Sequence, residues 1–325
     1  MRALIYVLAV LTGTASLVAV QQPSTPATAP APASPPSASA PAQAPGANSN
    51  SPAPRPQAAV DENVQYGEVQ GQKLLLDVYH PADGAAPGGA ARLHPAVILI
   101  HGGGWTSFDK STMRGMGQVL ARAGYVAFSV DYRLFHGPAA RFPAQLDDMQ
   151  RAVRWVRAHA DQYHVDRDHI GAFGHSAGAQ LAALLGMEDA RDNSDAALAA
   201  YSSRVQAVVD VSGPADLTSN RDPDGDAFLT QFLGVEYTKN PQAWRDASPI
   251  FHVAKSNAPF LIVHGARDAN VPIAQSEALA ASLREAGVPV NLVRVDGEHT
   301  FQTPEARRRL AIETLEFFNR YLKVN

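Results

Sequence analysis

The stretch that decides the fold is His169-Ile-Gly-Ala-Phe-Gly-His-Ser-Ala-Gly-Ala-Gln-Leu-Ala-Ala-Leu-Leu-Gly186. Its first seven residues are typical of a strand, and residues 176–186 form a run of small and apolar residues at helix length. Gly174 and Gly178 flank the junction, where the absence of a Cβ atom permits an abrupt turn. The pattern therefore predicts a strand–turn–helix connection with Ser176 at its tip.

A serine at such a tip is suited to nucleophilic catalysis. Gly174–Gly178 matches the pattern G-x-S-x-G, in which the strained turn exposes the serine hydroxyl. The amino end of the following helix directs partial positive charge at Ser176, which favours a developing oxyanion. The competing interpretation is a chance turn of small residues, and the strand–turn–helix context favours the nucleophile.

Outward from this turn, strand-length apolar runs alternate with helical patterns. Strands are predicted over 64–70, 73–79, 96–100, 125–130, 205–211, 259–264 and 290–295, and helices over 113–123, 142–159, 273–286 and 304–321. The first two strands read as an antiparallel hairpin. The alternation that follows predicts an α/β domain, doubly wound around a mostly parallel sheet. Residues 212–258 are predicted to form a small cap insertion.

A second glycine-rich segment, His101-Gly-Gly-Gly-Trp105, directly follows the 96–100 strand. Consecutive glycines cost backbone entropy but let backbone N–H groups approach a substrate oxygen. We expect Gly103 and Gly104, together with Ala177, to donate to an oxyanion. A phosphate-binding loop would need a Lys-Ser/Thr pair and an immediate helix, which are missing here. A flexible turn is the remaining alternative.

Trp105 closes this segment, and the sequence leaves two interpretations of it equally open. Its indole could line the substrate pocket, which would make it a substrate-binding residue, or it could pack beneath the loop.

A serine nucleophile needs a base, and the base needs an orienting acid. Asp268 and His299 occupy the loops after the last two predicted strands, at the sheet edge where sites form in such folds. The order Ser176, Asp268, His299 is that of the α/β-hydrolase triad. Rivals of Asp268 are Asp210, Asp216 and Asp296. Among the other histidines, His101 and His175 are expected to shape the two glycine motifs, and His264 to bond the backbone.

Five motifs in this order carry a family resemblance: His101–Trp105, Asp131-Tyr-Arg133, Gly174–Gly178, Asp268 with Val271-Pro272, and Gly297-Glu-His299. Together they resemble an α/β-hydrolase-fold serine esterase from Gln72 to Leu322. The glycine loop is shared with hormone-sensitive-lipase-like esterases, which usually carry aspartate where His175 stands. The hairpin around residues 74–79 looks closer to bacterial feruloyl-esterase-like, acetyl-xylan-esterase-like and arylformamidase-like enzymes.

The resemblance implies a serine carboxylesterase that hydrolyses short-chain acyl or aryl esters through an acyl-enzyme on Ser176, without a metal or organic cofactor. The substrate would be a small-molecule or polysaccharide-linked ester. An arylformamidase or serine peptidase of the same fold is the enzymatic alternative. A catalytically inactive hydrolase-fold binding protein is the non-enzymatic one, although the presence of all three triad residues argues against it.

Composition narrows the function classes. The chain of 325 residues contains no cysteine, which excludes a disulfide framework, a thiol nucleophile and a cysteine zinc site. From Asp61 onward 25 basic residues stand against 31 acidic ones. This balance argues against a nucleic-acid binder, which needs a concentrated basic surface.

The amino-terminal region differs from the rest. Arg2 and the apolar run after it predict a signal peptide over residues 1–20, with an uncleaved membrane anchor as the alternative. Residues 21–60 contain 11 of the 24 prolines and are predicted to be a disordered Ala/Pro/Ser-rich linker. We therefore expect a catalytic domain over 61–325, secreted or periplasmic, which meets a membrane only through an uncleaved signal.

Three carboxylates in five residues, Asp222, Asp224 and Asp226, could bind calcium. Their spacing departs from the EF-hand pattern, so an exposed polar loop of the cap is favoured.

Overall fold

The computed structural model describes residues 58–81, 92–189, 195–219 and 223–323. The predicted signal peptide and nearly all of the predicted linker lie outside these residues. Eight strands form one sheet in the order β1-β2-β4-β3-β5-β6-β7-β8. The strands are β1 Val60–Val69, β2 Gln72–Tyr79, β3 His94–Ile100, β4 Val126–Val130, β5 Val165–His175, β6 Ala207–Val211, β7 Phe260–Gly265 and β8 Val290–Val295.

The sheet is antiparallel at one edge and parallel elsewhere. β1 pairs with β2, and β2 with β4, in antiparallel register, so that Leu76 lies opposite Val130. Every pair from β4–β3 through β7–β8 is parallel. The predicted amino-terminal hairpin and the mostly parallel sheet are thereby confirmed.

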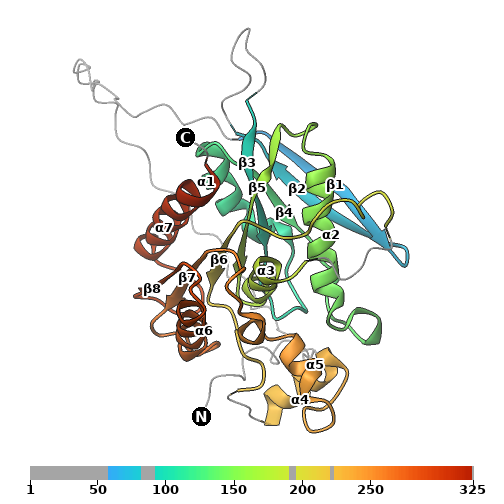
Figure 1. Ribbon diagram of the computed structural model, residues 1–325, viewed down its shortest axis with the longest axis vertical. Coiled ribbons are helices and arrows are strands. Elements are labelled where there is room, and N and C mark those ends of the chain that lie inside the picture. Colours follow the sequence, from blue (N-terminus) through green and yellow to red (C-terminus); the bar gives the residue numbers. More distant parts are fainter. Residues whose placement is uncertain (1–57, 82–91, 190–194, 220–222, 324–325) are drawn as a thin grey trace, which may run out of the picture. The chain divides into compact units, whose positions relative to one another are not determined.

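Helices cover both faces of the sheet, as Figure 1 shows. The longer helices are α1 Arg114–Arg122, α2 Ala144–Ala158, α3 Ala177–Met187, α6 Ala274–Glu285 and α7 Pro304–Leu322. The buried side chains of α1 and α7 belong to one core, and those of α2, α3 and α6 to the other. Among the described residues, no helix is long and apolar enough to cross a membrane.

β3 shows why the central strands are apolar throughout. Val97 and Leu99 face the α1–α7 core, whereas Ile98 and Ile100 face the core under α2, α3 and α6. Because successive side chains point to opposite faces, a strand covered on both sides needs apolar residues at every position.

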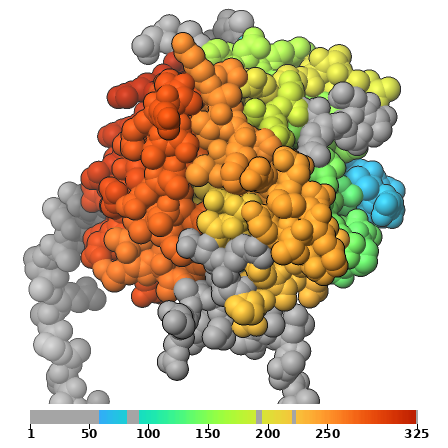
Figure 2. Space-filling view, turned by 60° about the horizontal axis from the view of Figure 1, so that its bottom comes forward, coloured from blue at the N-terminus to red at the C-terminus, as the bar shows by residue number. Residues whose placement is uncertain are grey.

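The predicted cap insertion lies between β6 and β7. It contains α4 Pro223–Leu233, α5 Pro241–Asp246 and the 3₁₀ turn η4 Pro249–His252. Figure 2 shows this excursion, in orange, spread over one face of the molecule beside the deeper orange of the residues after it. Phe232 and Trp244 are fully buried in the same core as α3, which anchors the excursion to the domain.

Candidate active site

Ser176 stands at the sharp turn that the sequence predicts, between β5 and α3. Its backbone has φ 56° and ψ −122°, a left-handed conformation that non-glycine residues rarely adopt. The Ser176 N–H donates to the carbonyl oxygen of Val211 at 2.8 Å, so the neighbouring strand β6 holds the turn. Strained residues of this kind cluster at functional sites.

The two glycines of the turn are required by close backbone contacts. A Cβ atom on Gly174 would lie 2.1 Å from the carbonyl oxygen of Gly178. A Cβ on Gly178 would lie 2.3 Å from the carbonyl oxygen of Ile100, at the end of β3. Any side chain at either position would therefore push the nucleophile turn away from the strands that support it.

The three predicted triad residues meet at the carboxyl edge of the parallel strands. Nε2 of His299 lies 2.8 Å from Oγ of Ser176, and Nδ1 of His299 lies 2.7 Å from Oδ2 of Asp268. Because an ionised carboxylate only accepts hydrogen bonds, Nδ1 carries the proton, which leaves Nε2 to accept from the serine hydroxyl. This tautomer is the one that a general base requires.

The Asp268 carboxylate is fully buried and surrounded by donors. Its Oδ1 accepts from the N–H groups of Asn270 and Val271, each at 2.9 Å. Burial alone would raise the pKa of Asp268, but hydrogen bonds from His264, His299 and the Val271 backbone outweigh burial and hold the pKa well below its ordinary value. Asp268 is therefore ionised at neutral pH.

His264 is a component of the site that the sequence analysis missed. Its Nε2 lies 3.1 Å from Oδ2 of Asp268 and 2.9 Å from the carbonyl oxygen of Val271. Since both neighbours are acceptors, Nε2 carries the proton, and Nδ1 accepts from the hydroxyl of Ser276 at 2.7 Å. The backbone bond was expected, but the contact with Asp268 was not. The sequence feature that could have indicated this contact is the position of His264 near the end of the strand that leads into the loop of Asp268.

The three rival aspartates lie elsewhere. Asp210 is buried at the end of β6 and accepts from the Gly213 N–H at 2.9 Å, and burial raises its pKa to about 6. Asp216 accepts from its own turn at Thr218, and the exposed Asp296 pairs with Arg267. Within the described residues, none of the three forms a hydrogen bond or an ion pair with His299.

The glycine loop after β3 passes beside the nucleophile. A Cβ on Gly102 would lie 3.1 Å from Cβ of Ser176, and Gly103 and Gly104 have φ values of 103° and 58°. Among the described residues, the N–H groups of Gly103, Gly104 and Ala177 have no hydrogen-bond acceptor. These donors are therefore available to a substrate oxygen, and their role as the oxyanion hole stays a prediction.

Tyr132, from the Asp131-Tyr-Arg133 motif, supports this loop. Its hydroxyl donates to the carbonyl oxygens of His101 at 3.0 Å and Gly102 at 3.3 Å. The Tyr132 ring also stacks on the imidazole of His101, with 4.3 Å between ring centroids. The loop is thus fixed by the segment that follows β4, and Tyr132 belongs to the same core as the buried side chains of α3.

Trp105 is packed inside the protein, with 5% of its surface exposed. Its ring stacks on Phe232 of α4 at 4.6 Å between centroids, and its indole N–H donates to Oε1 of Gln180 at 3.1 Å. Gln180 in turn donates to the carbonyl oxygen of Ala247 at 2.7 Å. The packing interpretation therefore describes this side chain in the structure, and a contact with substrate stays a prediction.

Two further features lie apart from the triad. Asp224 and Asp226 stand in the first turn of α4, not in the polar loop that was expected, and Asp222 lies outside the described residues.

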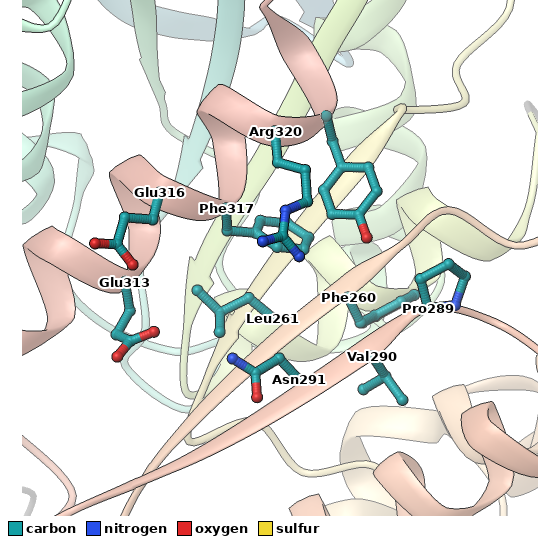
Figure 3. A pocket seen from close by; sticks show the side chains of 10 residues that line it. Phe260, Leu261, Pro289, Val290, Asn291, Glu313, Glu316, Phe317 and Arg320 are labelled. Carbon is teal, nitrogen blue, oxygen red and sulfur yellow. The ribbon is translucent and has the colours of Figure 1, made fainter.

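A cavity of about 350 Å³ is lined by Phe260, Asn291 and Arg320, among others (Figure 3). Because Phe260 begins β7 whereas Asp268 follows its end, this cavity lies at the opposite end of the strand from the triad.

Known proteins resemble this chain in sequence and in fold. Esterase LipQ of Mycobacterium tuberculosis is 34% identical over 237 residues, which are 72% of this chain and 55% of LipQ. The butyrate-bound Est2 esterase of Thermogutta terrifontis superposes with a TM-score of 0.69 at 27% identity, covering 82% of this chain and 94% of Est2. A truncated carbohydrate esterase from gut microbiota gives a TM-score of 0.68 at 26% identity, with 81% and 96% covered.

These likenesses and the eight-stranded, mostly parallel sheet define the class: the protein has the α/β-hydrolase fold of esterases. Residues 76–283 match the BD-FAE family, and the chain belongs to it. The chain spans about half the length of the curated relatives that it matches first.

Proposed function

We propose that the protein is a serine carboxylesterase. The observation that carries the proposal is the continuous hydrogen-bond chain from the Ser176 hydroxyl through His299 to the ionised Asp268. In a chain of this kind the base removes the hydroxyl proton, so that the otherwise poorly nucleophilic serine attacks as a strong nucleophile at neutral pH. Likeness to esterases in sequence and in structure supports the same activity.

In the proposed reaction, Nε2 of His299 takes the hydroxyl proton while Oγ of Ser176 attacks the ester carbonyl. The N–H groups of Gly103, Gly104 and Ala177 donate to the oxyanion that forms. Collapse of the tetrahedral intermediate breaks the ester C–O bond, and His299 returns its proton to the leaving alcohol. Water then attacks the acyl-enzyme with the same base and releases the acid.

The proposed substrates are small-molecule esters with short acyl or aryl groups. The butyrate bound in Est2 supports a short acyl group, and the likeness to a carbohydrate esterase supports esters carried on polysaccharide. An arylformamidase would use the same residues on an amide bond. Rates on p-nitrophenyl acetate, methyl ferulate, acetylated xylan and N-formylkynurenine distinguish these substrates.

Fluorophosphonate labelling of the purified protein tests the function. We expect labelling and ester hydrolysis in the wild type, and loss of both in Ser176→Ala by several orders of magnitude. Ser212 provides a matched control, because it is a buried serine with φ 54° at the end of the adjacent strand β6. Ser212→Ala should keep both activities, and a Ser176→Ala protein that is still labelled would refute the assignment.

We also propose that the enzyme is exported, on the strength of the basic and apolar pattern over residues 1–20. Intact-mass measurement of protein recovered outside the cytoplasm tests this proposal, and a mass that retains Met1 would contradict cleavage.

A further inference from the structure

Phe108 has an unusual combination of exposure and backbone conformation. Its side chain is 65% exposed, the most of any large hydrophobic residue described. Its φ is 70°, in the left-handed region that is an outlier for a bulky side chain. Because the side chain is mostly exposed, little hydrophobic free energy is gained by placing a phenylalanine here. Packing therefore does not explain why a phenylalanine adopts a backbone conformation that glycine would adopt without strain.

The backbone on both sides of Phe108 is fixed by hydrogen bonds. On one side, the N–H of Ser107 donates to the carbonyl oxygen of Gly103 at 3.1 Å. On the other, the N–H of Lys110 donates to Oδ1 of Asp131 at 2.7 Å. These anchors determine the conformation in between, as is required for a strained residue to persist.

The aromatic ring borders the glycine loop. Cδ2 of Phe108 lies 2.8 Å from the place that a Cβ atom on Gly103 would occupy. Gly102, the residue before Gly103, approaches Ser176 so closely that a Cβ atom on it would lie 3.1 Å from Cβ of the serine. Phe108 thus packs against one glycine of the loop, the neighbouring glycine contacts the nucleophile, and most of the Phe108 surface faces solvent.

We infer that Phe108 is a specificity-determining residue that stacks on a ring carried by the ester. The chemistry is that of an aromatic face against a flat apolar surface, which an aryl ring or the C–H face of a sugar ring can supply. The inference rests on the proposed esterase function and names a substrate class for it. Esters without a ring would make no such contact.

Three variants separate the ring from the backbone strain. Phe108→Gly removes both, Phe108→Leu removes the ring and keeps the strain, and Phe108→Tyr keeps both. Gln70→Gly is the matched control, because Gln70 is an exposed residue with φ 51° in the β1–β2 turn. The substrates are phenyl acetate, monoacetylated xylose and vinyl acetate, which form the same acetyl-enzyme, and methyl ferulate, which places the ring on the acyl side. Titration of the released acid gives kcat/KM for each.

We expect Phe108→Gly and Phe108→Leu to lower kcat/KM for ring-bearing esters about fivefold to tenfold relative to vinyl acetate. Phe108→Tyr should keep the wild-type preference. Phe108→Gly, but not Phe108→Leu, should also raise Tm by about 2–4 °C, because the strain is relieved. Gln70→Gly should leave every kcat/KM unchanged. The ring-bearing ester with the largest loss of kcat/KM shows whether the ring that stacks on Phe108 is an aryl ring or a sugar ring.

Equal losses for all four esters, or none, would overturn the inference and leave the esterase function standing. A wild-type protein that hydrolyses no ester and is not labelled by fluorophosphonate would instead overturn the proposed function itself.

Discussion

Nε2 of His175 donates a hydrogen bond to the backbone carbonyl of His299 at 2.9 Å, and the two imidazole rings lie 5.1 Å apart. The residue before the nucleophile therefore holds the backbone of the proposed base. Desolvation lowers the pKa of His175 to about 4, outweighing the hydrogen bond to His299, which raises it. His175 is accordingly neutral while the enzyme works.

Replacing His175 should loosen the His299 loop. We expect His175→Ala to lower kcat by about tenfold with a smaller change in KM, because a misplaced base slows chemistry more than binding. His175→Gln, which retains a side-chain N–H donor, should recover part of kcat. Steady-state kinetics on p-nitrophenyl acetate provide the measurement. A change confined to KM would contradict this role.

The same histidine should contribute to acid sensitivity. In the unfolded chain its pKa returns to about 6.5, whereas in the folded protein it is about 4. Between these values the unfolded state binds more protons, so the free energy of unfolding falls as the pH falls, by up to about 3 kcal/mol for this group. Urea unfolding from pH 7 to pH 4 should show this loss, and His175→Gln should show a smaller one.

His264 is expected to act through Asp268 as a positioning residue. His264→Leu removes one donor to the Asp268 carboxylate and should raise the pKa of that carboxyl. Because the ionised carboxylate orients His299, a loosened carboxylate should lower kcat/KM mainly through kcat at every pH at which the wild type is active. Loss of one charge-assisted hydrogen bond predicts a fall of about 10- to 100-fold.

Ser276 supplies the control for this prediction. Ser276→Ala keeps the contact between His264 and Asp268 and should cost less than His264→Leu. A loss confined to KM, with kcat unchanged, would contradict the positioning role.

Ionisation of Asp210 should lower the free energy of unfolding at high pH. Its pKa is raised by burial to about 6, so its stabilising neutral form is present in acid and is lost as the pH rises through 6. Asp210→Asn keeps an acceptor for the Gly213 N–H and should stabilise the fold at pH 8 by up to about 3 kcal/mol. The gain should vanish near pH 4 in denaturant titrations. An equal effect at both pH values would exclude ionisation as the cause.

The Tyr132 hydroxyl should hold the glycine loop in the conformation that catalysis requires. Tyr132→Phe keeps the stacking on His101 but removes the hydroxyl donated to the two loop carbonyls. We expect stability to fall by about 1 kcal/mol and kcat by about tenfold, since the predicted oxyanion donors lose their support. Tyr125→Phe, which removes a hydroxyl bonded to Asn319 on the α7 side, should lower stability without lowering kcat.

Much of the fold was predictable because each central strand is a short apolar run between helical patterns. β5 marks the limit. It begins at Val165, whereas the sequence indicated 169, because the charged residues 166–168 interrupt the apolar pattern. Backbone pairing of His94 with Val165 extends the strand, and a hydropathy pattern does not report such pairing.

The triad was predictable because its three residues follow three strand ends in a recognisable order. His264 and Phe108 were not. In the sequence nothing distinguishes His264 from the other ten histidines. Its role depends on the loop after β7, which folds back so that the Val271 carbonyl accepts from His264. Phe108 violates the conformational preference of its residue type, and a rule based on preference places a glycine there instead.

The bridge from Trp105 through Gln180 to Ala247 has a consequence for redesign. It links the glycine loop, the nucleophile's helix and the excursion between β6 and β7 in one line of buried polar contacts. Grafting a foreign cap to alter selectivity would leave the Gln180 amide without its acceptor, and the disturbance would reach the loop at Trp105. The excursion is therefore not an interchangeable module, and a successful graft must supply a carbonyl where Ala247 now provides one.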